Sequence, residues 1–390
     1  MLSVVIPTYE PIAIDKVLEG LGRQTNDAFE VIVVENGPAT EGLSDKLGRY
    51  RERLDLKHEH LPEPGLNRAR NHGVGCARYP LVALLDDDCV PHEDWARCVL
   101  DSHQRYPRAG VIGGRVDLAF ASDPPSWLQG EFRSSLAEVD WGDRSGPLGR
   151  WQHVVGTNLS FRKEVFQRIG GFQRRLGLTG REEVVRANDE AEFVLQATLR
   201  GDPGAVYAAG MRVDHLIPDN RVDFQYMLRR RFGQGVSDIE QDVMLLGWDA
   251  AEDRLATMLY PSTWHLEEHE RWADMMDAPE RLDFQMKYLM ARIVYLVGAR
   301  ERFCHPAPMI GRMSLNRRVE RRAIERGRKT GAGLDLGSPD GNVIRRLQAL
   351  VYRDRPPADP HVAICFLAGI FQQVLPLHVE AVSATPEATI

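Results

Sequence analysis

The chain has 390 residues, of which 43% are hydrophobic and 27% are charged, and its formal net charge at pH 7 is −7. This apolar fraction excludes wholesale disorder, and the length suits two domains or one large domain with an appendage. The acidic balance disfavours binding to nucleic acid. Five cysteines without a CxxC pair indicate neither a disulfide framework nor a cysteine zinc site.

The sequence predicts neither a secretory signal nor a segment that spans a membrane. Met1 leads almost directly into an apolar run without a basic segment or a cleavage site. The longest apolar stretches, at residues 289–297 and 362–377, are too short or too interrupted to span a bilayer. We therefore expect a cytoplasmic protein.

Short runs rich in Val and Ile alternate with helical patterns over the first 120 residues. The runs lie at residues 2–7, 31–34, 82–85 and 111–116, and the helical patterns lie at residues 14–23 and 66–77. Unbroken apolar runs of this length are typical of strands that are buried on both faces of a sheet. Their alternation with helices predicts an α/β domain.

The pattern changes twice further along the chain. Residues 120–150 are irregular and contain several Pro and Gly, which predicts a long loop. A strand at 154–161, short helices from residues 163 and 188, and a strand at 205–213 follow. Helical patterns dominate beyond residue 222. We therefore expect an α/β domain at residues 1–240 and a mostly helical region at residues 241–390.

Three aspartates, Asp86, Asp87 and Asp88, follow the strand expected at residues 82–85. Open α/β sheets bind ligands at the carboxyl ends of their strands. Alternate residues of an extended segment point to the same side, so Asp86 and Asp88 would share one face. Adjacent carboxylates repel unless a cation compensates. The cluster predicts a Mg²⁺ or Mn²⁺ site completed by ligand phosphates, with an acidic surface loop as the alternative.

A phosphate ligand has no glycine-rich loop to bind it in this sequence. No GxxxxGK[ST] motif is present, and the first turn after a strand, Thr8-Tyr9-Glu10-Pro11, contains no glycine. These observations favour phosphate held through a metal ion and disfavour a dinucleotide-binding dehydrogenase.

Two further positions are candidates for chemistry at strand or helix ends. Asp189 and Glu190 follow Asn188 at a predicted helix start, where carboxylates either stabilise the helix dipole or act as a general base. His215 follows the strand expected at 205–213 and is either a structural residue or a further metal ligand.

Taken in order, these motifs resemble the inverting nucleotide-sugar glycosyltransferases of the GT-A fold, the family-2 type. The resemblance covers about residues 1–235. It rests on SVVIPTYE (3–10), VIVVENGP (31–38), GLNRARN (65–71), LLDDDCVP (84–91), GTNLSFRKEVF (156–166) and DEAEF (189–193). It implies a Rossmann-like mixed sheet flanked by helices. The QxxRW motif of processive family members is not present, which argues against a polymerising synthase.

The resemblance also implies roles for individual residues. It places the nucleotide and the donor sugar against Pro7, Thr8, Tyr9, Glu10, Glu35, Asn67, Arg70, Asp86, Asp87, Gly156 and Asn158. It implies a metal site at Asp86, Asp88 and His215, and a catalytic base at Glu190, with Asp189 second. Glu35 stands where the family usually has Asp.

The function implied is a metal-dependent inverting transfer from a UDP, GDP or dTDP sugar to the hydroxyl or amine of an unidentified acceptor. Two alternatives remain open at this point. One is another metal-dependent enzyme of nucleotide diphosphates, such as a nucleotidyltransferase or a hydrolase. The other is a non-catalytic nucleotide-binding scaffold. Residues 307–330, with eight Lys or Arg against two Glu, would let the C-terminal region contact a membrane surface, and it could also bind the acceptor or form a homodimer.

Overall fold

The computed structural model describes residues 1–149, 152–174, 187–188, 190–247, 250–251, 325–326 and 329. Asp189 and nearly all of the helical region expected at 241–390 lie outside these residues. The chain divides into two compact units, residues 1–182 with 187–227, and residues 183–186 with 228–390. The domain boundary expected at residue 240 falls inside helix α8 (Phe224–Leu246). That boundary stays a prediction.

The first unit alternates strands and helices along most of its length. The strands are β1 (Leu2–Thr8), β2 (Phe29–Asn36), β3 (Leu56–Leu61), β4 (Leu81–Leu85), β5 (Cys89–Pro91), β6 (Val111–Phe120), β7 (Gly146–Pro147), β8 (Asn158–Arg162) and β9 (Ala205–Ile217). The helices are α1 (Ile14–Gly22), α2 (Leu43–Gly48), α3 (Leu66–Cys76), α4 (Trp95–Arg105), α5 (Glu131–Ser134), α6 (Lys163–Ile169), α7 (Ala191–Arg200) and the 3₁₀ helix η1 (Asp219–Arg221).

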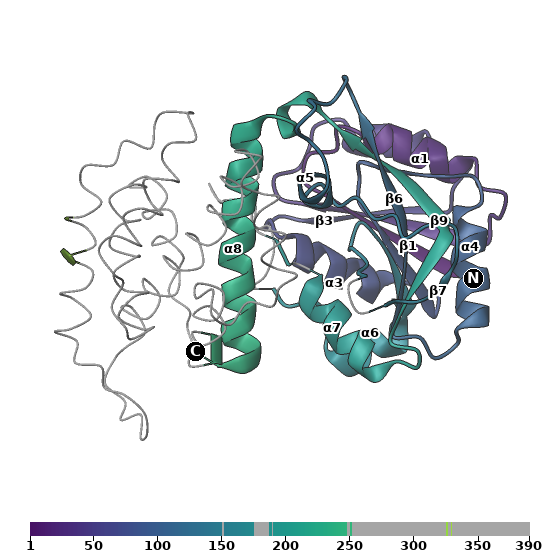
Figure 1. The fold of residues 1–390 in the computed structure, drawn as a ribbon. Coiled ribbons are helices and arrows are strands. Elements are labelled where there is room, and N and C mark those ends of the chain that lie inside the picture. The colour runs from purple at the N-terminus through teal and green to yellow at the C-terminus, as the bar shows by residue number, and fades with distance from the viewer. Residues whose placement is uncertain are drawn as a thin grey trace. The chain divides into compact units, whose positions relative to one another are not determined.

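One mixed sheet organises this unit (Figure 1). Within the residues described, nine strands join in the order β3-β2-β1-β4-β8-β6-β9-β5, with β7 paired to β9. Strands β3, β2, β1 and β4 are mutually parallel, whereas β8 runs antiparallel to β4 and β6. The mixed α/β sheet expected from the sequence is therefore confirmed.

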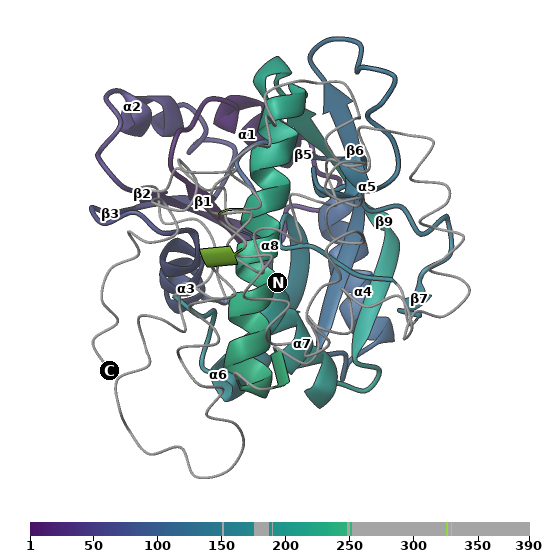
Figure 2. The same ribbon diagram turned by 60° about the vertical axis from the view of Figure 1, so that its left-hand side comes forward.

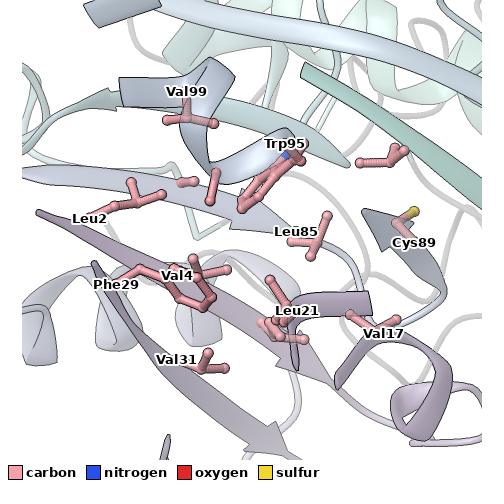
Figure 3. Close-up of a cluster of buried hydrophobic side chains, with 14 of the residues drawn as sticks. Leu2, Val4, Val17, Leu21, Phe29, Val31, Leu85, Cys89, Trp95 and Val99 are labelled. Atoms are coloured by element: carbon pink, nitrogen blue, oxygen red, sulfur yellow. The ribbon is translucent and has the colours of Figure 1, made fainter. Parts of the chain in front are cut away.

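Two apolar cores lie on opposite faces of the sheet, because successive side chains of a strand point to opposite sides. On β1, Leu2, Val4 and Ile6 belong to one core and Val5 belongs to the other. Figure 3 shows the first core, in which the fully buried Trp95 of α4 lies among the strand side chains.

Helices cover both faces of the sheet (Figures 1 and 2). Helices α1, α2 and α4 contribute to the first core, and α3 and α7 contribute to the second, with α6 packed against it. In the second core, the rings of Phe172 and Phe193 lie 4.3 Å apart. This contact ties the start of α7 to the segment that follows α6.

The structure differs from the sequence expectations at several elements. Strand β3 was not expected, because as the outermost strand it carries the polar sequence LKHEHL and is only partly buried. Strand β9 extends to Ile217 because β6 pairs with it along this stretch, so His215 lies within the strand and not after it. Short elements α5 and β7 interrupt the loop expected at residues 120–150. Among the helices described, none combines the length and the apolar character needed to cross a membrane.

Candidate active site

The carboxyl ends of β1 and β4 meet at one edge of the sheet. The two strands are parallel neighbours, so Thr8 at the end of β1 lies close to the three aspartates that follow β4. The Thr8 hydroxyl donates a hydrogen bond to Asp87. The predicted turn after β1 and the predicted aspartate cluster therefore form one site.

Asp86 is held by two groups from other parts of the chain. The Thr157 hydroxyl donates to its Oδ2 at 2.9 Å, and Nη2 of Arg70 lies 3.3 Å from its Oδ1. Arg70 comes from α3 and is 1% exposed, and Thr157 precedes β8. These contacts orient the Asp86 carboxylate.

Asp88 is paired with a histidine and an arginine. Nη1 of Arg221 donates to Oδ2 of Asp88 at 3.0 Å, and Nε2 of His215 lies 3.4 Å from the same oxygen. His215 is brought to this place by β9, which pairs Cys89 of β5 opposite it, and Arg221 ends η1.

The His215 ring presents a lone pair to Asp88. Its Nδ1 lies 2.9 Å from the carbonyl oxygen of Leu136, which can only accept, so Nδ1 carries the proton of the neutral ring. A lone pair on Nε2 and a carboxylate oxygen repel each other unless a cation lies with them. In this structure Arg221 is that cation, 3.5 Å from Nε2.

This donor set fits a divalent metal ion. A histidine that ligates a metal usually donates its other ring N–H to a carbonyl or carboxylate, as His215 does to Leu136. Donor atoms of Asp88, Cys89 and His215 lie within 4.8 Å of one another. Burial raises the pKa of the Cys89 thiol well above its ordinary value, and Mn²⁺ and Mg²⁺ favour oxygen over sulfur, so the Asp88 carboxylate and the His215 imidazole are the better candidate ligands.

Burial and charge separate the pKa values of the neighbouring aspartates. Burial, with the charge of Asp88, raises the pKa of Asp87 to about 7. Burial alone would also raise the pKa of Asp88, but the positive charge of Arg221, and that of His215 when its ring is protonated, outweigh burial and lower it. Of these two residues, Asp88 is therefore the ionised carboxylate and Asp87 is the one more easily neutralised.

Glu190 and Arg70 both lie next to Gly156 in this site. Glu190 immediately precedes α7, and a Cβ atom at Gly156 would meet Nη2 of Arg70 at 2.8 Å and Cβ of Glu190 at 3.1 Å. The absent side chain of Gly156 thus leaves room for both. Glu192, in the first turn of α7, is buried, and burial raises its pKa. Glu190 is partly exposed and is therefore the more accessible of these two carboxylates.

The residue expected to contact the nucleotide base lies at the end of β2. Glu35 is 3% exposed, accepts a hydrogen bond from the Thr40 backbone N–H, and has its Oε2 3.2 Å from Nε2 of His58 on β3. Its two oxygens therefore have partners within the protein. The ring of Tyr9 packs against Gly37, where a Cβ atom would meet it at 2.6 Å.

Of four other expected site residues, three have mainly structural surroundings and one is exposed. Pro7 lies in the buried strand β1, and Glu10 is exposed in the turn that follows it. The Asn67 amide donates to the carbonyl of Gln173 at 2.8 Å, which ties α3 to that segment. Asn158 is fully buried, donates to the carbonyls of Arg115 and Met211, and accepts from the Trp95 indole.

Sequence reasoning missed Thr157, Arg221, His58 and Asn36. The amide of Asn36 donates to the Thr8 carbonyl at 2.8 Å and accepts from the Gly65 N–H at 2.9 Å, so it joins the ends of two elements of the site. Asn36 lies in the motif VIVVENGP (31–38) and Thr157 lies in GTNLSFRKEVF (156–166), so their positions in these motifs could have indicated a role in the site. Arg221 and His58 lie in no such motif.

Comparison with known proteins finds relatives among sugar-transferring enzymes. Residues 3–170 match the sequence profile of glycosyl transferase family 2. A glucosyl-dolichyl phosphate glucuronosyltransferase of Haloferax volcanii is 26% identical over 262 residues, which cover 65% of this chain and 81% of that protein. A validoxylamine A glucosyltransferase of Streptomyces hygroscopicus subsp. jinggangensis is 29% identical over 47% of this chain and 50% of that protein.

Among solved structures, a mannosyltransferase of Pyrobaculum calidifontis in complex with GDP-Man and Mn²⁺ superimposes with a TM-score of 0.48 and 19% identity. The superposition covers 76% of this chain and 86% of that one.

The mixed sheet and the aspartates at its edge, together with the matching profile and the sequence relatives, define a nucleotide-sugar-dependent glycosyltransferase. Over residues 3–170, a little under half of its length, the chain matches glycosyl transferase family 2. The resemblance that its motifs indicated is confirmed.

Proposed function

We propose that the chain catalyses a metal-dependent transfer of a hexosyl group from a nucleotide diphosphate sugar to an acceptor hydroxyl or amine by a single displacement. The observation that carries this proposal is the convergence of Asp86, Asp88 and Glu190 on one edge of the sheet, where Arg70 contacts Asp86 and lies, like Glu190, next to Gly156. Two relatives are named as a glucuronosyltransferase and a glucosyltransferase, which supports a hexosyl donor.

Asp88 and His215 would hold Mn²⁺ or Mg²⁺, with Asp86 alongside. When bound, such an ion neutralises negative charge on the diphosphate leaving group. The Asp86 carboxylate is already oriented by Thr157 and Arg70, so no reorganisation is needed there when the donor binds.

The nucleotide would lie across the ends of β1 and β2. The Tyr9 ring and the backbone of Gly37 form a surface on which a base can stack. Because Glu35 is already bonded to Thr40 and His58, it would act on the base together with His58 and not alone.

Glu190 would be the base that accepts the proton of the acceptor. The deprotonated oxygen or nitrogen then attacks the anomeric carbon from the face opposite the diphosphate, which inverts the configuration there. The alternative base Asp189 lies outside the described residues.

The test begins with calorimetric titration of the full chain with UDP, GDP and dTDP, each with Mn²⁺ and with EDTA. We expect one nucleotide to bind in Mn²⁺ and to lose its affinity in EDTA and in Asp88→Asn. An absence of binding by all three nucleotides would contradict the proposal.

The second step separates transfer from binding. With the nucleotide sugar identified in this way, Glu190→Gln should keep donor affinity and lose at least a hundredfold in transfer rate. Glu164→Gln is the control, because Glu164 is an exposed residue of α6. If Glu190→Gln transfers the sugar at the wild-type rate, another residue is the base. If the wild-type chain binds the nucleotide sugar but transfers no sugar, a non-catalytic scaffold is favoured.

A further inference from the structure

A second group of metal-ligating side chains lies away from the aspartate cluster. Nε2 of His72 lies 3.1 Å from Oε2 of Glu59 and 3.6 Å from Sγ of Cys76, and the three donor atoms lie within 4.8 Å of one another. We call these residues the Cys76 cluster. Glu59 lies on the outermost strand β3, which β2 and β1 separate from β4 and its aspartates.

The fold creates this cluster from two elements. His72 and Cys76 stand four residues apart on α3, so they share one face of the helix. Glu59 shares its side of β3 with Leu61, which packs against the core that α3 covers. All three side chains are partly exposed, so an ion from solvent can reach them.

A single proton on Nε2 makes one strong hydrogen bond here and leaves the sulfur as a weak second partner. The single nitrogen Nε2 faces both a carboxylate oxygen and a sulfur, and it carries at most one proton. If Nε2 donates to Glu59, it has no lone pair for the thiol hydrogen of Cys76. If it accepts from Cys76, its lone pair faces the carboxylate of Glu59.

A zinc ion would satisfy all three atoms at once. Zinc bonds sulfur at about 2.3 Å and imidazole nitrogen at about 2.0–2.1 Å in tetrahedral sites, which places the two ligand atoms about 3.6 Å apart. The separation of Sγ and Nε2 found here, 3.6 Å, agrees with that geometry. Thiolate and imidazole ligands select zinc over Mg²⁺ and Mn²⁺, which prefer oxygen.

We propose that Glu59, His72 and Cys76 bind Zn²⁺, with water as the fourth ligand. Binding releases the Cys76 thiol proton to solvent and leaves the thiolate on the metal. The ion would link the outer strand β3 to α3, the helix that also carries Arg70 of the donor site. The proposal does not depend on the transferase activity.

Cobalt titration of the chelator-treated full chain tests the site, because Co²⁺ bound to a thiolate absorbs through sulfur-to-metal charge transfer. We expect one equivalent of Co²⁺ to produce this absorption, Zn²⁺ to remove it, and excess Mn²⁺ to leave it unchanged. Cys76→Ser should abolish the absorption. Cys98→Ser is the matched control, since Cys98 is a partly buried free cysteine on α4, and it should retain the absorption. No absorption in the wild type, or equal absorption in Cys76→Ser, would overturn the proposal.

Two further measurements keep the test valid if Cys76→Ser fails to fold. In the wild-type chain, Zn²⁺ should protect Cys76 from alkylation by iodoacetamide, read by mass spectrometry. In Glu59→Gln, on the edge strand, and in His72→Gln, Co²⁺ affinity should fall at least tenfold. Alkylation of Cys76 at the same rate with and without Zn²⁺ would overturn the proposal, as would unchanged Co²⁺ affinity in both variants.

Discussion

At the Asp88 carboxylate, the Arg221 guanidinium and a bound metal ion would compete for the same oxygen. Arg221 donates to its Oδ2 at 3.0 Å, and His215 directs the Nε2 lone pair toward the same oxygen. A guanidinium here neutralises the carboxylate without any bound ion. A divalent cation at Asp88 must therefore replace the contact made by Arg221.

This competition predicts the effect of Arg221→Gln on metal binding. Because the amide cannot neutralise Asp88, we expect Mn²⁺ alone to bind about three- to tenfold more tightly than to the wild type. Calorimetric titration with Mn²⁺ measures this. Arg212→Gln serves as the control, since Arg212 pairs with Asp117. Equal or weaker Mn²⁺ affinity in Arg221→Gln would show that Arg221 does not compete with the metal.

Gly156 is the second residue whose role depends on its immediate neighbours. In Gly156→Ala the new Cβ would meet Arg70 and Glu190 at 2.8 and 3.1 Å and displace one of them. We expect at least a tenfold loss of kcat/KM in a transfer assay, because small displacements of positioning groups slow catalysis strongly. Gly48→Ala, with no atom within 4 Å of its new Cβ, should leave kcat/KM unchanged. Equal activity of the two variants would contradict the placement of Gly156.

At the scale of elements, α4 buries a neutral histidine against the sheet. The Ser160 hydroxyl of β8 donates to the Ile112 carbonyl at 3.0 Å, so its oxygen accepts from Nε2 of His103 at 3.1 Å. Nδ1 of His103 is buried and has no hydrogen-bond partner in the described part of the chain. A proton added to Nδ1 would therefore place an unpaired charge in the core.

This burial predicts a pH dependence of stability. Burial, with the charge of Arg162, lowers the pKa of His103 from 6.5 to about 3. Between these values the unfolded chain binds a proton that the folded chain does not, so the free energy of unfolding falls as the pH falls. The loss is about 1 kcal/mol per pH unit between about pH 6 and pH 4. Urea unfolding of the wild type and His103→Gln over this range should show the smaller slope in the variant, and parallel slopes would refute the assignment.

Helix α3 approaches β1 closely at Gly73. A Cβ atom at Gly73 would meet Cγ1 of Val5 at 2.3 Å. A Cβ atom at Gly75, on the same helix, would have no neighbouring atom within 4 Å. We expect Gly73→Ala to lower the free energy of unfolding by about 2 kcal/mol through overpacking. Gly75→Ala should instead raise it by up to about 1 kcal/mol, because Ala favours helix. Urea unfolding of both variants gives the comparison, and similar values for the two would contradict this packing.

At the scale of the molecule, the donor site draws on much of the first unit. Its residues come from the ends of β1 and β4, from α3, from β9 and from the start of α7. A ligand that contacts such distant segments stabilises the folded unit as a whole, because it binds only when all of them are in place.

Ligand binding should therefore raise the stability of the chain only when metal is present. At a nucleotide concentration 100 times its Kd in Mn²⁺, the free energy of unfolding should rise by about 2.7 kcal/mol. Thermal unfolding with UDP, GDP or dTDP measures this, and EDTA should remove the increase. The same stabilisation in EDTA would mean that the nucleotide binds without the metal.

Much of the fold could be predicted because strands, helices and strand ends have local patterns. The apolar runs at β1, β2, β4 and β6 predicted the buried strands, and the three aspartates after β4 predicted the edge at which the site lies. The polar strand β3 was not predicted, because an outer strand has one exposed edge and does not need a continuous apolar run.

By itself, then, the sequence determined the α/β class, the family resemblance and the acidic centre of the site, since each depends on neighbouring residues. Only the tertiary structure decided which distant side chains join them. Thr157 at Asp86, Arg221 at Asp88 and the contact of Glu59 with His72 each link separate segments. Such contacts depend on the order of strands in the sheet and on which face each helix covers, and no local period or spacing encodes either.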